Sequence, residues 1–308
     1  MLKINKFKGL VAAPFTPMDQ KGNLNTAMIP EYYSFLEKNG ISGAFINGST
    51  GEGVSLTQKE KQINASVWAE CLRAGGKIRI INLVGGTSYH ECIENAIFSM
   101  EEGLSAIAVV APYYFKPGSD SQLAEFVARV GEAVPEMPLY FYHIPVLTGV
   151  ALPMAPFLEK ISGMLPNFAG IKYTHEDFMD FLTCLNYKEG AYDMLWGRDE
   201  CMLSSLVLGC SGAVGSTYNY AAPLYLALIE AFNKGDLVQA RRLQQKSIDM
   251  IALLGKYGGI AAGKAFMRYI GFECGEFRLP VKNIDSKMFD HFVAEVRDLG
   301  MDEMFSKK

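Results

Sequence analysis

The stretch FAGIKYT (residues 168–174) places a lysine inside an otherwise apolar run. Phe168, Ala169 and Ile171 are typical of a strand that is buried on both faces, where an ammonium group is costly. Lys172 therefore either reaches water from the strand end, pairs with an acid, or serves a chemistry that needs an amine with a lowered pKa. Position alone leaves the structural and the chemical interpretation open.

Seven more short apolar runs resemble this one, and amphipathic helical patterns such as residues 57–75 and 121–134 separate them. The seven runs are LVAAPFT (10–16), GAFIN (43–47), IRIINLVG (78–85), AIAVVAP (106–112), PLYFYHIP (138–145), YDMLWG (192–197) and GAVGST (212–217). A doubly wound sheet would need a glycine-rich phosphate turn after its first strand, but FTPMDQKGN (15–23) follows instead. The alternation predicts an α/β fold of the (β/α)₈ (TIM) barrel type.

The last part of the chain is predicted to be helical only. Residues 236–258 and 286–300 show the apolar spacing of packed surface helices. We therefore expect two parts, a (β/α)₈ barrel over residues 1–235 that carries the active site and a C-terminal helical extension over residues 236–308.

Composition excludes several classes of protein. The chain has 308 residues, is 49% hydrophobic and carries a formal net charge of −4, so it offers no basic surface for nucleic acid or anionic lipid. No apolar run approaches the length of a membrane span, and the first residues lack a signal-peptide core. The six cysteines show neither a CxxC pair nor zinc-finger spacing. These features predict a cytoplasmic protein with reduced thiols.

Polar residues recur where the predicted strands end. The site of a (β/α)₈ barrel is built at the carboxyl ends of its strands, so these residues would converge on one mouth. They are Ser49 and Thr50 after the second strand, Tyr113 and Tyr114 after the fourth, Tyr142 and His143 in the fifth, Lys172 in the sixth, Asp199 and Glu200 after the seventh, and Ser216 and Thr217 after the eighth.

These residue types favour covalent chemistry on a carbonyl group. A desolvated Lys172 would be a neutral amine able to form a Schiff base, and Tyr142 could transfer protons. Each residue also has a plain structural interpretation, because tyrosines are common in cores and GST turns commonly cap helices. Asp199 and Glu200 could likewise be charges at a helix N-terminus.

Other common site chemistries lack their patterns. His143 and His175 have no third partner at metal-ligand spacing, and HExxH is absent from the sequence. The nucleophile elbow GxSxG of serine hydrolases is also missing. We expect neither a metal nor another cofactor.

The motifs GSTGE, YHIPVLTG, GIKYT, GRDE and GAVGSTYN, in this order, resemble the N-acetylneuraminate lyase branch of the dihydrodipicolinate synthase superfamily. The resemblance covers essentially the whole chain. It implies a pyruvate-dependent class I aldolase that cleaves sialic acid reversibly to N-acetylmannosamine and pyruvate, assembled as a homotetramer and acting on small molecules without nucleic acid or membrane.

The resemblance also implies a role for each matching residue. Lys172 resembles the Schiff-base lysine and Tyr142 the proton-transferring tyrosine. Ser49 and Thr50 are expected to hold the pyruvate carboxylate, and Thr174 is expected to contact the substrate. The residues expected to hold the sugar are Gly197, Asp199, Glu200 and Ser216. Tyr114 resembles a tyrosine that reaches across a subunit interface.

One position distinguishes the branches of the superfamily. Synthases have an arginine two residues after the proline of the YxxP segment, and this chain has Leu147 there, which cannot bind a carboxylate. His143 and Arg198 depart from many relatives and could change the preference among sialic acid variants. Another pyruvate-dependent aldolase or dehydratase, and a non-catalytic barrel that senses pyruvate or sialic acid, remain alternatives.

Overall fold

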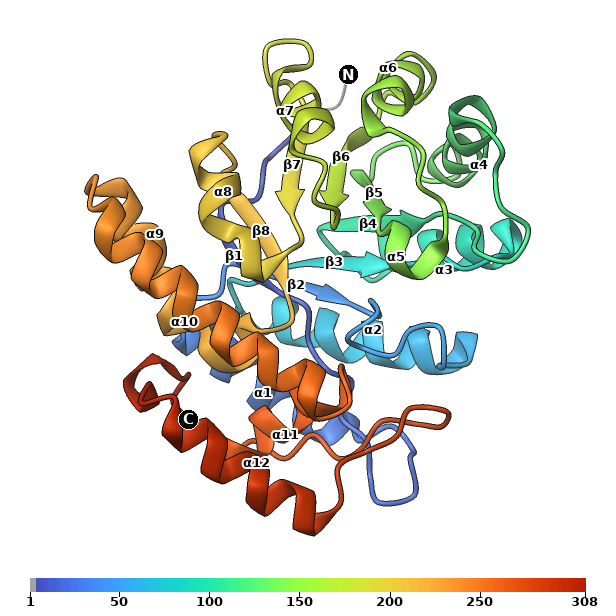
Figure 1. Ribbon diagram of the computed structural model, residues 1–308. Coiled ribbons are helices and arrows are strands. Elements are labelled where there is room, and N and C mark those ends of the chain that lie inside the picture. Colours follow the sequence, from blue (N-terminus) through green and yellow to red (C-terminus); the bar gives the residue numbers. More distant parts are fainter. Residues whose placement is uncertain (1–3) are drawn as a thin grey trace.

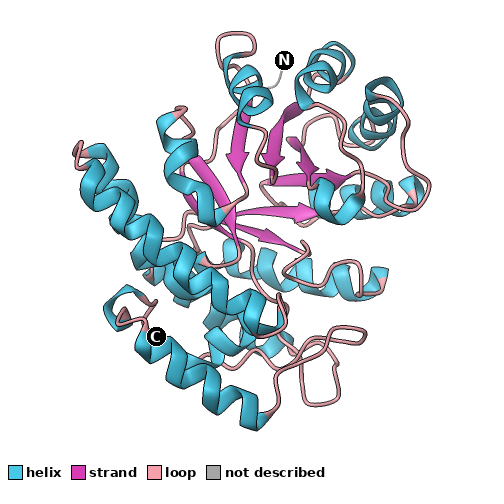
Figure 2. Cartoon of the chain, in the orientation of Figure 1, coloured by secondary structure: helices cyan, strands magenta, loops and turns pink. Residues whose placement is uncertain are grey.

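Eight parallel strands form a closed ring in the computed structural model, which describes residues 4–308 (Figures 1 and 2). Consecutive strands pair, and β1 pairs with β8 to close the ring. The strands are β1 (Gly9–Ala12), β2 (Gly43–Ile46), β3 (Arg79–Leu83), β4 (Ala106–Val110), β5 (Leu139–His143), β6 (Phe168–Tyr173), β7 (Asp193–Trp196) and β8 (Gly212–Gly215). All eight predicted strands are present, and the (β/α)₈ barrel is confirmed.

Helices surround the ring and cover the outer face of every strand (Figure 1). They are α1 (Ile29–Lys38), α2 (Gln58–Arg73), α3 (Tyr89–Glu101), α4 (Asp120–Gly131), α6 (Met154–Met164), α7 (Phe178–Asn186), α8 (Met202–Val207) and α9 (Tyr218–Asn233), with the short α5 (Pro145–Thr148) after β5. Single 3₁₀ turns are η1 (Thr26–Met28), η2 (Asp199–Cys201) and η3 (Asp302–Met304). No helix within residues 4–308 is both long enough and apolar enough to span a bilayer.

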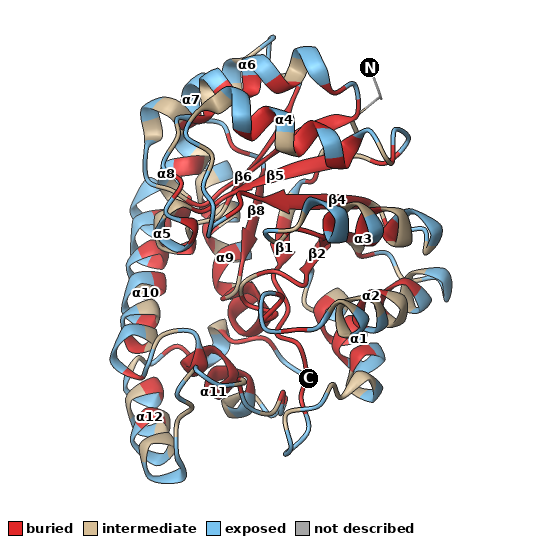
Figure 3. Cartoon of the chain, turned by 90° about the vertical axis from the view of Figure 1, so that its right-hand side faces the viewer, coloured by how far each residue is buried: buried red, intermediate tan, exposed pale blue. Residues whose placement is uncertain are grey.

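The strands are apolar on both faces because each face packs against a separate core. One cluster fills the inside of the ring and includes Phe45, Tyr140 and Tyr142. The other lies between the strands and the helices and includes Phe141 and Phe168. Figure 3 shows the resulting pattern, with buried strands and with most of the surrounding helices buried on one side and exposed on the other. Such double burial explains why the runs read as continuously apolar.

The C-terminal part contains three helices, α10 (Leu237–Lys256), α11 (Ala261–Tyr269) and α12 (Ser286–Asp298). The predicted C-terminal helical appendage is confirmed, and residues 270–285 form an irregular segment between α11 and α12. This segment returns to the barrel and contacts the loops after β1 and β2. The division of the chain at residue 235 stays a prediction; α9 and α10 pack against each other on either side of it.

A bulge in β6 decides which side chains point into the ring. Phe168 and Gly170 pair with consecutive residues of β5, so Ala169 is an extra residue in β6. Beyond the bulge, Lys172 pairs with Tyr142, and both point inward. Strict alternation from the outward-facing Phe168 would have directed Lys172 toward the helices. The bulge therefore places the lysine inside the barrel.

Candidate active site

Lys172 lies inside the ring near the carboxyl end of β6 and is only 4% exposed. Its Nζ is 4.0 Å from the ring centroid of Phe45 and 4.0 Å from that of Tyr142. These two rings are themselves packed edge to face, with centroids 5.4 Å apart. The amine is thus enclosed by aromatic side chains rather than by carboxylates.

This burial changes the acidity of the lysine. Loss of water lowers the pKa of Lys172 to about 7, and the nearby Asp199 partly opposes the shift. Because the ammonium form loses its hydration when buried, the neutral form becomes accessible near neutral pH. A neutral amine is a competent nucleophile for a ketone.

Tyr142 is the direct neighbour of Lys172 across the β5–β6 pair. Burial raises the pKa of Tyr142 to about 12, and the nearby hydroxyls of Ser49 and Thr174 partly oppose this. The phenol therefore stays protonated while it waits and can pass a proton between two groups. Ser49 and Thr174, from loops far apart in the sequence, thus meet at one phenol.

Ser49 and Thr50 belong to a tight turn, residues 47–53, directly after β2. Thr50 is buried, and Ser49 is partly exposed toward the mouth of the barrel. The hydroxyl of Thr16 in the loop after β1 donates to the carbonyl of Gly51 at 2.5 Å. The turn is therefore anchored beside Tyr142 by its own backbone and by a neighbouring loop.

Thr174 directly follows β6. Because it comes two residues after Lys172, its side chain points to the same face of the strand, toward the inside of the barrel. Its backbone N–H donates to the His143 carbonyl at 2.8 Å. Among the described residues its hydroxyl is buried without a hydrogen-bond partner. Gly197 lies so close to this hydroxyl that any Cβ there would overlap it. This buried hydroxyl lies close to the Tyr142 phenol and is available to a ligand.

Asp199 is the first residue of η2 and is only 6% exposed. It is therefore more than a surface charge at the N-terminus of a helix. Its Oδ2 accepts hydrogen bonds from the Thr217 hydroxyl at 2.6 Å and the Thr217 N–H at 3.2 Å. Its Oδ1 is buried and has no partner in the part of the chain described. Burial raises the pKa of Asp199 to about 6. Its free oxygen is a further acceptor inside the mouth.

Glu200 lies further out and belongs to a charged group. Its carboxylate is 3.2 Å from Arg198 Nη2, and Arg198 also pairs with Glu176 from the loop after β6. Ser216, which follows β8, is partly exposed at the same end of the barrel. Glu200 and Ser216 therefore edge the opening rather than the interior.

Two residues singled out in the sequence do not join this cluster. Tyr114 is 77% exposed and packs edge to face with Phe115. His143 points outward from β5, where it lies 5.0 Å from the Tyr173 ring and 5.7 Å from His175 between centroids. Burial lowers its pKa to about 3, so His143 is a neutral part of the outer core.

The structure also adds residues that the sequence did not single out for a role. Phe45 encloses the lysine, and only the barrel register could have revealed this contact. Thr217 binds Asp199, and its place directly after β8 was the available signal. Within residues 4–308 no group of three side chains is arranged to hold a metal ion.

Comparison with known proteins gives consistent results. The profile of the dihydrodipicolinate synthetase family matches residues 6–299. N-acetylneuraminate lyase from Danio rerio is 38% identical over 284 residues, covering 91% of this chain and 92% of that protein. The Homo sapiens protein of the same name is 36% identical over 301 residues, covering 96% and 93%.

A solved structure agrees with this assignment. Proteus mirabilis N-acetylneuraminate lyase superposes with a TM-score of 0.92 at 34% identity, covering 96% of this chain and 99% of that one. The sequence match and the fold agree. The chain belongs to the dihydrodipicolinate synthetase family.

Proposed function

We propose that this chain is a Schiff-base aldolase that cleaves N-acetylneuraminate to N-acetylmannosamine and pyruvate, reversibly. The observation that carries the proposal is the enclosed amine of Lys172, which lies directly beside Tyr142. Burial lowers the pKa of this amine to about 7. The names of the relatives support the choice of substrate.

The reaction begins at the amine. The neutral Nζ of Lys172 adds to the C2 ketone of the open-chain sugar acid, and the adduct loses water to give a protonated imine. Ser49 and Thr50 hold the substrate carboxylate with their hydroxyls. The imine is the electron sink that makes the next bond cleavage possible.

Cleavage then needs a proton to leave the C4 hydroxyl. The oxygen of Tyr142 accepts this proton while its own O–H proton passes to the substrate carboxylate, as the C3–C4 bond breaks and the electrons of that bond enter the imine to form an enamine. Because burial raises the pKa of Tyr142 to about 12, the phenol relays the proton instead of persisting as a phenolate. N-acetylmannosamine leaves, C3 is protonated, and water releases pyruvate and the free amine.

The remaining residues fit the sugar part. The Thr174 hydroxyl would donate a hydrogen bond to a sugar hydroxyl or accept one from it, and the free Oδ1 of Asp199 would accept one. Glu200 and Ser216 would bind the polyol tail at the opening, and Gly197, whose missing Cβ leaves room for the Thr174 hydroxyl, would contact the sugar through its backbone. Leu147 in α5 offers no charge for a second carboxylate, which favours a hydroxylated aldehyde over an acidic one.

Two changes test the scheme. Lys172→Ala should abolish pyruvate release from N-acetylneuraminate and prevent a borohydride-stable pyruvate adduct, because the electron sink is lost. Tyr142→Phe should be slowed by about 10²–10⁴-fold, the usual contribution of general acid–base catalysis, yet still form the adduct.

The measurement is a coupled pyruvate assay, with mass spectrometry of the peptide that contains Lys172. Near-normal turnover of Lys172→Ala would contradict the mechanism. An adduct on Lys172 without cleavage of N-acetylneuraminate would indicate another pyruvate-dependent aldolase or dehydratase, and no adduct at all would indicate a binding protein.

We also propose a cytoplasmic homotetramer. All six cysteines are unpaired, which supports a reducing compartment. Tyr114, Phe115, Val146 and Leu147 are 63–86% exposed and come from the loop after β4 and from α5, an apolar area that a neighbouring subunit would cover. In such an assembly Tyr114 would reach the neighbour's site.

A further inference from the structure

The turn at residues 47–53, which carries Ser49 and Thr50, has an unusual backbone. Asn47 and Glu52 have φ values of 55° and 58°, in the left-handed region that side-chain-bearing residues rarely adopt. The Gly53 N–H donates to the Gly48 carbonyl at 3.0 Å, and Gly53 is packed so closely on Asn47 that a Cβ would overlap it. A conformation of this kind persists only when its surroundings hold it.

Glu52 connects this turn to the C-terminal part of the chain. Its side chain is 4% exposed, and Oε1 accepts a hydrogen bond from Lys264 Nζ of α11 at 2.9 Å. Oε2 accepts from the backbone N–H of Arg278 at 2.8 Å. Lys264 is equally buried and also donates to the Glu276 carbonyl at 2.9 Å. Both carboxylate oxygens are therefore bound by residues from the last fifth of the sequence.

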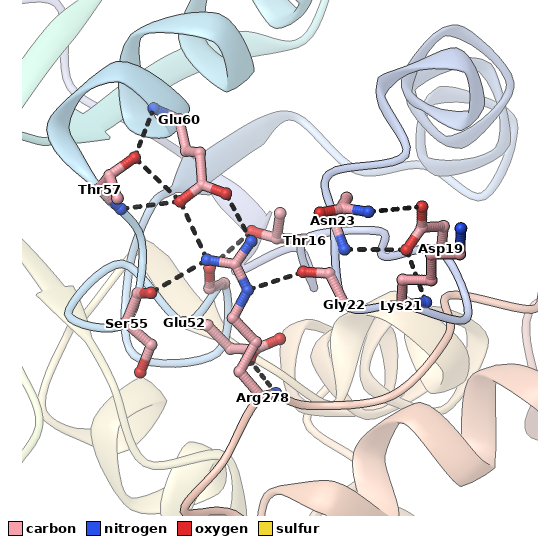
Figure 4. A network of polar contacts seen from close by, with 11 residues as sticks. Thr16, Asp19, Lys21, Gly22, Asn23, Glu52, Ser55, Thr57, Glu60 and Arg278 are labelled. Carbon is pink, nitrogen blue, oxygen red and sulfur yellow. Dashed lines mark hydrogen bonds and ion pairs between the residues drawn. The ribbon is translucent and has the colours of Figure 1, made fainter.

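Arg278, in the segment between α11 and α12, makes further contacts to the loops after β1 and β2, as Figure 4 shows. Its guanidinium binds both carboxylate oxygens of Glu60, the residue that also completes the N-terminal cap of α2 with Thr57. It further donates to the Gly22 carbonyl at 2.8 Å and the Ser55 carbonyl at 3.1 Å. The segment between α11 and α12 is thus bound to the loops after β1 and β2 at once.

The chemistry of the buried pair argues for more than stability. Burial lowers the pKa of Lys264, and the charge of Glu52 opposes that shift. A buried ion pair loses much of its attraction to desolvation, so apolar residues of similar size would often stabilise a fold as well. The pair instead fixes the orientation of the Glu52 side chain, because each of its carboxylate oxygens accepts a hydrogen bond from one specific donor.

We infer that Glu52 is a positioning residue, which holds the turn at residues 47–53 so that Ser49 and Thr50 present their hydroxyls to the carboxylate of a keto acid. The link is short, since the Glu52 N–H donates to the Ser49 carbonyl at 3.2 Å. Lys264 and Arg278 are the partners that fix Glu52. This inference rests on the proposed function, in which the same hydroxyls bind pyruvate.

The test is the pyruvate concentration that half-saturates borohydride trapping on Lys172. Glu52→Gln keeps the shape of the side chain but loses the charge that orients the turn. The half-saturating concentration should rise on the order of tenfold or more, because small misplacements of binding groups are costly. The adduct at saturating pyruvate should still be complete, since Lys172 and Tyr142 are untouched.

Glu60→Gln is the matched control. It weakens a partly exposed contact of Arg278 on the outer side of the same loop and leaves the Glu52–Lys264 pair intact, so the half-saturating concentration should change by less than about twofold. If Glu52→Gln does not fold, Glu52→Asp retains the charge and shortens its reach, and the same rise is expected.

The outcomes separate the two proposals. A folded Glu52 variant with wild-type half-saturation, even at a lowered Tm, would overturn the positioning role and leave the aldolase proposal standing. Failure of the wild-type protein to form any adduct would overturn the aldolase proposal itself. A rise in half-saturation that Glu60→Gln reproduces in full would also contradict the role, because the effect would then belong to the loop as a whole.

Discussion

At the scale of single residues, the surroundings of Lys172 decide its chemistry. Removal of water favours the neutral amine, whereas the ring faces of Phe45 and Tyr142, each 4.0 Å away, favour the ammonium form. The negative charge of Asp199 acts in the same direction as the rings. Burial is the largest of these effects, and the net result is a pKa of about 7.

The rate of imine formation should therefore depend on pH in a specific way. The amine reacts only when it is deprotonated, so at low pyruvate concentration the initial rate should rise with pH and reach half its maximum near the pKa of Lys172, about 7. The measurement is incubation with pyruvate at each pH, followed by a borohydride quench at one fixed pH. A rate that rises only above about pH 9, as for an ordinary lysine, would contradict the lowered pKa.

At the scale of elements, the bulge in β6 is the feature on which the site depends. Gly170 lies directly against the backbone of Asp193 in β7, where no side chain fits. The glycine therefore permits the close approach of β6 and β7 at the point where the register shifts. A slip of one residue here would turn Lys172 out of the barrel.

Gly170→Ala should consequently harm both stability and activity. The added Cβ would push the two strands apart, which should cost about 1–3 kcal/mol of unfolding free energy, as overpacking does. Adduct formation on Lys172 should slow as well. Chemical denaturation and borohydride trapping measure the two effects.

Gly163→Ala provides the control for this change. Gly163 lies on the exposed side of α6 with open space around the position of its Cβ. Alanine there should be neutral or stabilising by up to about 1 kcal/mol, because alanine favours helices. Equal losses in both variants would show that the bulge has no special role.

Much of this organisation could be predicted from the sequence, and physical reasons explain the rest. The strands were predictable because burial on both faces leaves continuously apolar runs, and the site followed from the rule that barrel sites lie at the strands' carboxyl ends. The bulge at Ala169 was not predictable, since it depends on the pairing partner. The Glu52–Lys264 pair joins positions 212 residues apart. Nothing in the sequence around either residue indicates that the other is its partner.

At the scale of the whole molecule, the most exposed aromatic side chains among the described residues lie in the loop after β4, next to the barrel mouth. Phe115 is 86% exposed and Tyr114 77%. Lys116, which follows them, contacts Gly149 at the end of α5, so the two apolar loops lie side by side. An area of this kind is typical of a surface that another protein covers.

Charged residues at this surface should therefore disperse the assembly. Replacing Tyr114 and Phe115 together by lysine should convert the proposed tetramer to a smaller species, because like charges would face each other across the interface. Light scattering after size-exclusion chromatography measures the mass. Val238→Lys, at an exposed site on α10, is the control and should leave the mass unchanged. A tetramer that persists in the double variant would place the interface elsewhere.

The anchoring of the turn after β2 has a consequence for biosynthesis. The donors that bind Glu52 lie 212 and 226 positions further along the chain. A ribosome delivers them last, after every strand of the ring has already emerged. An incomplete polypeptide would therefore contain the reactive nitrogen of Lys172 but not an ordered turn to bind the keto acid. The enzyme would become active only after the last part of the chain has been translated.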